Sequence, residues 1–76
     1  MRAPILVDRN LMYALTQDDR GKLFLEVVVG GIAMENRVLP LSAFEQAEYQ
    51  SKGKLVLDEL AKDVLRDRAK FAGRLI

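Results

Sequence analysis

The sequence contains no cysteine and no histidine among its 76 residues. These two absences exclude disulfide bonds, thiol nucleophiles, imidazole general bases and zinc-finger ligand sets. A chain of this length buries only about 60–65% of the surface that its unfolded form exposes, so a monomer would be marginally stable. We therefore expect further stabilisation to come from a second protein chain.

Long apolar runs and a strong charge excess are missing too. Residues 5–7 are apolar but too few for the core of a signal peptide, and no run approaches the roughly 18 residues of a membrane span. Twelve basic and eleven acidic residues give a net charge of +1, which is no general reason to expect binding to nucleic acid or anionic membrane. We expect a cytoplasmic protein that does not bind membranes.

The segment around which the chain is arranged covers residues 22–31 and is rich in strand-forming residues. Alternation assigns Leu23, Leu25, Val27 and Val29 to one face and Phe24, Glu26 and Val28 to the other. Only Glu26 clearly requires water. A strand that is apolar on both faces is typical of the centre of a sheet.

Two flanking segments complete the predicted sheet. Residues 11–16 alternate as a first strand, and residues 17–21 form a turn into the central strand. Gly30 and Gly31 indicate a hairpin, so residues 32–41 should return as a third strand, with Pro40 suited to an edge. A two-residue turn would place Glu26 opposite Glu35, so a bulge or a longer loop is the alternative.

Two helices are predicted after the sheet. Ser42 and Glu45 form a capping-box pattern for a helix over residues 43–51, which Gly53 would end. A longer amphipathic helix begins at Lys54 and ends at Gly73, or breaks at Asp67. Its apolar stripe comprises Leu57, Leu60, Ala61, Val64, Leu65, Arg68, Phe71 and Ala72.

The predicted fold is therefore a single small α+β domain over residues 1–76. It has an antiparallel three-stranded meander, followed by a short helix and a longer C-terminal amphipathic helix packed on one sheet face. Residues 1–10 are predicted to be an N-terminal arm and a turn, because Pro4 cannot donate a ladder hydrogen bond.

This fold leaves one sheet face without a cover, because the short helix has few apolar residues. The residues that would face water are Ile5, Val7, Phe24 and Val28. Exposing a large apolar side chain forfeits roughly 1.5–3 kcal/mol, against a total stability of roughly 5–15 kcal/mol. We predict a homodimer with these four residues at the interface. The alternative is a monomer in which the short helix, the arm and the tail close that face.

No residue pattern indicates a catalytic, cofactor or metal site. The acidic residues are interpreted as solvated charges: Asp18, Asp19, Asp58, Glu59, Asp63 and Asp67. Ser42 has no histidine to act as its base, and it already caps a helix. Tyr13 and Tyr49 are interpreted as packing residues whose hydroxyls reach water.

The function predicted from these observations is a non-enzymatic protein–protein interaction module that self-associates through its sheet. The same observations are compatible with a second protein partner, whose identity the sequence does not give. The alternative is a small nucleic-acid-associated regulator that uses the basic residues Arg66, Arg68, Lys70 and Arg74 near the C-terminus. Interleaved acidic residues make nucleic-acid binding the weaker interpretation.

Overall fold

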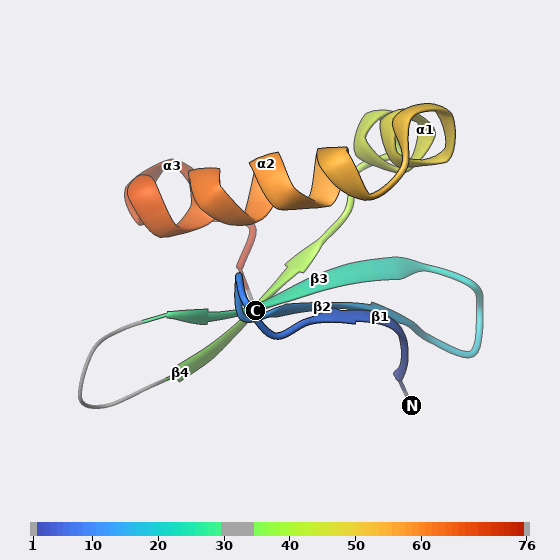
Figure 1. The fold of residues 1–76 in the computed structure, drawn as a ribbon, viewed down its shortest axis with the longest axis horizontal. Helices are drawn as coiled ribbons and strands as arrows, with labels where there is room; N and C mark the ends of the chain where they lie inside the picture. Colours follow the sequence, from blue (N-terminus) through green and yellow to red (C-terminus); the bar gives the residue numbers. More distant parts are fainter. Residues whose placement is uncertain (1, 30–34, 76) are drawn as a thin grey trace.

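The structure is a computed structural model that describes residues 2–29 and 35–75. Its elements are β1 (Ala3–Asp8), β2 (Tyr13–Gln17), β3 (Leu23–Val29), β4 (Glu35–Pro40), α1 (Ala43–Lys52), α2 (Lys54–Arg66) and α3 (Arg68–Phe71). The strands form one antiparallel sheet in the order β1-β2-β3-β4. The helices lie together on one side of this sheet (Figure 1). The predicted α+β class is confirmed.

The predicted number of strands is wrong, because the sheet has four strands and not three. The segment predicted as an arm forms the edge strand β1, which pairs with β2 from Ala3 opposite Gln17 to Asp8 opposite Tyr13. Pro4 is tolerated because an edge strand has only one neighbour, and a shift in the pairing register follows it before Leu6. The pairing of β1 with β2 outweighs the loss of the one hydrogen bond that the Pro4 nitrogen cannot donate.

The central position of β3 agrees with its apolar character on both faces, since it pairs with β2 and with β4. Glu26 lies opposite Val38, and Val29 lies opposite Glu35. The register of a two-residue turn, with Glu26 opposite Glu35, is therefore not formed. Gly30 and Gly31, on which the hairpin prediction rests, lie outside the described residues.

The capping box that the sequence predicts is present at the start of α1. The Ser42 hydroxyl accepts a hydrogen bond from the Glu45 amide (3.1 Å), and the Glu45 carboxylate accepts one from the Ser42 amide (2.9 Å). Gly53, with φ of 77°, lies between α1 and α2 in a conformation that favours glycine. Asp67 then separates α2 from α3, so the helix breaks there and does not run unbroken to Gly73.

The hydrophobic core fills the space between the helices and one face of the sheet. From α2 it contains Leu57, Ala61 and Val64, and from the sheet mainly Leu15, Leu25, Val27 and Leu39. The predicted packing of the amphipathic helix on one face is therefore observed. Leu65, assigned to the apolar stripe, is 45% exposed.

Candidate functional site

The sheet face turned away from the helices is the surface on which the predicted interface residues fall. The strand register aligns one cross-strand row on this face: Val7, Ala14, Glu26 and Val38. A second row joins Pro4, Thr16, Phe24 and Pro40. None of the described helices covers these rows (Figure 1). We call this surface the open face.

The four predicted interface residues differ in exposure. Ile5 and Val7 are 51% and 58% exposed, and Val28 is partly buried. Phe24 is only 8% exposed. The open face therefore offers most of its free apolar area at β1 and beside Val28, and less at Phe24.

Phe24 is covered by cationic side chains of its own chain. The Arg2 guanidinium lies 5.1 Å from the centre of the Phe24 ring, and the Lys22 ammonium lies 5.7 Å from it. Such cation–π contacts hide an aromatic ring from water without a second layer of structure. Alternation along a strand cannot predict these contacts, because they depend on where residue 2 lies.

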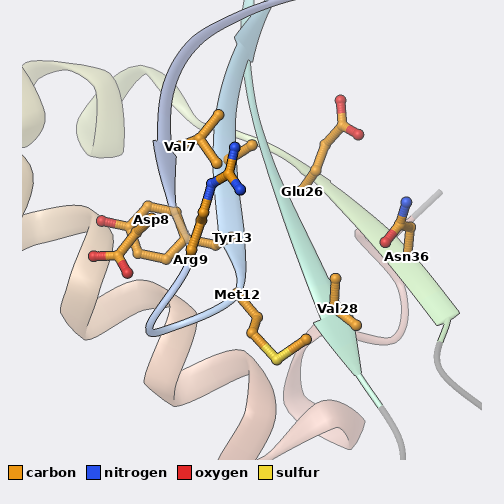
Figure 2. Close-up of a pocket in the computed structure, with 9 residues that line it drawn as sticks. Val7, Asp8, Arg9, Met12, Tyr13, Glu26, Val28 and Asn36 are labelled. Carbon is orange, nitrogen blue, oxygen red and sulfur yellow. The ribbon is translucent and has the colours of Figure 1, made fainter.

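A shallow hollow of about 330 Å³ lies on the open face between the β1–β2 turn and β3. Figure 2 shows Val7, Met12 and Val28 along it, with Arg9 beside Val7 and with Glu26 and Asn36 on the far side. Its lining combines apolar side chains with charges of both signs. A surface of this kind suits contact with another polypeptide.

Met12 belongs to this surface but was missed by the sequence analysis, which assigned it to a strand. It is 41% exposed, and its φ of 56° lies in the left-handed region that a bulky residue seldom adopts. The turn is held by the Asp8 carboxylate, which accepts a hydrogen bond from the Leu11 amide (2.8 Å), and by the Met12 carbonyl, which accepts one from the Val28 amide (3.0 Å). A strained, exposed apolar residue thus projects from a well-anchored turn.

Glu26 is the carboxylate at the middle of the open face, and it is already engaged within the chain. Its carboxylate accepts a hydrogen bond from the Thr16 hydroxyl (2.9 Å) and lies 3.6 Å from the Arg2 guanidinium. Thr16 is buried beneath this contact. Because the Glu26 carboxylate already has partners, covering this face would not bury an unpaired charge.

A polar cluster of Asp8, Tyr13, Lys54 and Asp58 joins the sheet to the start of α2. The Tyr13 hydroxyl donates to Asp58 (2.5 Å), and the Lys54 ammonium donates to Asp8 (2.6 Å) and to Asp58 (2.9 Å). Tyr13 is only 2% exposed, so the expectation that its hydroxyl reaches water is wrong. Asp58, interpreted as a solvated charge, is instead part of this cluster.

The protonation of the cluster follows from these contacts. Burial, together with the hydrogen bond to Asp58, raises the pKa of Tyr13 to about 12. The hydrogen bond from Tyr13, followed by that from Lys54, lowers the pKa of Asp58, and the hydrogen bond from Lys54 lowers the pKa of Asp8. At neutral pH the phenol stays protonated and both carboxylates stay charged, so the cluster acts as a tie between sheet and helix.

Three of the four basic residues near the C-terminus contact groups of their own chain, and the side chain of Arg68 lies outside the described part of the structure. Arg66 pairs with Asp63, and the Arg74 guanidinium donates to the Glu45 carboxylate (2.5 Å) and to the Pro40 carbonyl (3.2 Å). The Lys70 ammonium lies 5.5 Å from the centre of the Phe71 ring. The nucleic-acid alternative stays a prediction.

Comparison with known proteins finds no relative of this chain. No known protein family, no curated protein and no solved structure matches the chain. Among the described residues, no helix is long and apolar enough to cross a membrane. The candidate site therefore rests on the geometry of the open face.

Proposed function

We propose that this chain is a non-enzymatic protein–protein interaction module, and that it forms a homodimer by packing its open face against the open face of a second copy. The observation that carries the proposal is the one-sided arrangement of the helices, which leaves Ile5 and Val7 more than half exposed on a four-stranded sheet. Burying such side chains is the main source of favourable free energy in association.

The edges of the sheet favour contact through faces over contact through edges. β1 carries Pro4 and a shift in its pairing register, and β4 ends at Pro40. Proline and irregular pairing hinder a further strand from adding to an edge. A dimer built by extending the sheet is therefore disfavoured.

The charges on the open face are compatible with a second copy. Arg9 and Glu26 both line the hollow, so the surface carries both signs. In a twofold interface each residue of one copy meets the corresponding patch of the other, and a surface of mixed sign avoids like-charge repulsion there.

The size of the face predicts a weak dimer. Four strands about 4.8 Å apart and about 20 Å long project onto roughly 400 Å², which is a lower bound because side chains add relief. Specific interfaces of standard size bury about 800 Å² on each partner, and weaker, transient ones bury less. We expect a dissociation constant in the micromolar range.

Light scattering over a concentration series tests this proposal with a matched pair of variants. The wild-type protein should move from 8.6 kDa towards twice that mass as its concentration rises through the micromolar range. Val7→Lys should keep the monomer mass, because it places a charge among the exposed apolar side chains that the contact would bury. Leu55→Lys should dimerise like the wild type, because Leu55 is similarly exposed, at 62%, but lies on α2.

Two results would contradict the proposed function. One is a mass of 8.6 kDa at every concentration up to the millimolar range. The other is an equal loss of dimer in both variants, which would mean that added charge anywhere on the surface prevents association. Far-ultraviolet circular dichroism of each variant shows whether it has kept its fold.

A further inference from the structure

The hollow on the open face is lined by one charged side chain that no described residue of its own chain contacts. Arg9 is exposed and lies beside Val7 at this hollow (Figure 2). In the described part of the chain, the Arg9 guanidinium forms no hydrogen bond, ion pair or aromatic contact. Covering a guanidinium without giving its N–H groups an acceptor costs free energy. A surface that packs on the hollow should therefore bring an acceptor to Arg9.

Glu26, on the same face, has an oxygen atom that can accept from such a cation. The Thr16 hydroxyl donates to Oε2 of Glu26, and the Arg2 guanidinium lies 3.6 Å from the same atom. No described residue donates to the other oxygen, Oε1. An ionised carboxylate accepts at about four positions, so Glu26 can keep its present contacts and accept from a further guanidinium.

The other carboxylate at the hollow has both of its oxygens occupied. Asp8 accepts from the Lys54 ammonium (2.6 Å) through one oxygen and from the Leu11 amide (2.8 Å) through the other. Arg9 and Glu26 belong to different ends of the hollow, since β1 and β3 are two strand spacings, about 10 Å, apart. The open face thus carries a cation and a carboxylate oxygen that a second molecule can satisfy.

We propose that Arg9 of one copy pairs with Glu26 of the second copy, and that this pair fixes how the two sheets lie on each other; the inference rests on the proposed open-face dimer. A second copy carries both complementary groups, and a twofold interface forms the Arg9–Glu26 contact twice. The apolar side chains of Val7, Met12 and Val28 line the same hollow and would be buried between the two pairs. Charge pairs of this kind determine orientation and the choice of partner.

Charge reversal tests the pair by light scattering of separate and mixed variants. Arg9→Glu puts like charges at both contacts of a homodimer, and so does Glu26→Arg. Each variant alone should associate roughly a hundredfold more weakly and keep the mass of 8.6 kDa at micromolar concentration. An equimolar mixture restores both pairs in a heterodimer, and it should reach twice that mass.

A matched pair of variants on α2 controls for net charge. Lys62→Glu and Glu59→Arg each reverse one charge, as the open-face variants do, but at exposed positions of the helix. Each of these two variants alone should dimerise like the wild type. Their mixture should contain the heterodimer only in the statistical proportion, because the α2 residues do not meet across the open face.

Glu26→Arg also removes the acceptor of the Thr16 hydroxyl, so far-ultraviolet circular dichroism must show that it has kept its fold. If it is unfolded, Glu26→Gln replaces it, because the amide oxygen can still accept from Thr16. Glu26→Gln, Arg9→Gln and the double variant then form a double-mutant cycle. If the two residues pair across the interface, the double variant should associate no more weakly than either single variant.

Three outcomes would overturn the proposal while the wild type dimerises. They are wild-type affinity in Arg9→Glu, a mixture of the two open-face variants that stays at the monomer mass, and an equal preference for the heterodimer in the α2 control pair. In the double-mutant cycle, additive losses would do the same. A wild type that stays at 8.6 kDa at every concentration instead contradicts the proposed dimer itself, so the two failures give different results.

Discussion

At the scale of single residues, the backbone of Met12 combines strain with exposure. A left-handed conformation costs a residue with a Cβ atom roughly 1–2 kcal/mol, and it persists only where surrounding contacts impose it. At Met12 those contacts are the hydrogen bonds of the β1–β2 turn and of β3.

Substitution of Met12 separates the backbone effect from the side-chain effect. Met12→Gly and Met12→Ala both remove the exposed side chain, but only glycine adopts φ of 56° freely. We expect Met12→Gly to be more stable than Met12→Ala by about 1 kcal/mol in urea unfolding. If both variants unfold at the same urea concentration, the turn is not strained at this position. Under the dimer proposal, both should also associate more weakly than the wild type.

Tyr13 is the residue whose titration reports the tie between sheet and helix. In a Tyr49→Phe background, near-ultraviolet absorbance should show Tyr13 ionising at about 12, against 10.0 for a free phenol. Since the pKa is raised in the folded state, this contribution to stability is complete below pH 10 and is lost as the pH rises towards 12. Asp58→Asn should lower the midpoint but keep it above 10.0, because burial is the larger cause. An unchanged midpoint in that variant would show that the hydroxyl does not donate to Asp58.

At the scale of elements, α1 is the helix with the least packing. None of its ten residues is buried. It is held by its capping box, by Tyr49, which packs against the core, and by Arg74, which binds the Glu45 carboxylate. Burial alone would raise the pKa of Glu45, but the hydrogen bonds from Arg74 and Ser42 and the charge of Arg74 together lower it, so the carboxylate stays charged and keeps both partners.

Removal of the cap should therefore loosen α1 selectively. Ser42→Ala should cost about 1 kcal/mol of stability and speed amide hydrogen exchange in α1 more than in α2. Ser42→Asp, which keeps a side-chain acceptor, is the matched control and should retain nearly all of that stability. Equal protection of α1 in the wild type and in Ser42→Ala would mean that the capping box does not hold the helix.

At the scale of the whole molecule, the described strands and helices form two layers, and no described element covers the second face of the sheet. A dimer through that face links folding to association, because the folded state alone forms the dimer. The melting temperature of the wild type should then rise with protein concentration, and that of Val7→Lys should not. Differential scanning calorimetry at a low and a high concentration measures both slopes. If the melting temperatures of the two proteins change equally with concentration, stability does not depend on association through the open face.

The candidate site was predictable in part. Alternation along residues 23–29 assigned Val28 to a face that no described helix covers, and the apolar Val7 was expected to need a partner surface. The covering of Phe24 by Arg2 and Lys22 and the exposure of Met12 at a left-handed turn were not predicted. These features depend on contacts between segments and on one backbone dihedral, and neither has a local pattern.

By itself, the sequence determined the central strand, the capping box at Ser42 and the amphipathic character of α2. Each of these depends on residues a few positions apart, where propensity and periodicity act directly. Only the tertiary structure decided that residues 3–8 form an edge strand, that Glu26 faces Val38, and that Tyr13 is tied to Asp58. Those outcomes depend on hydrogen bonds and packing between distant segments, whose relative free energies no single stretch of sequence contains.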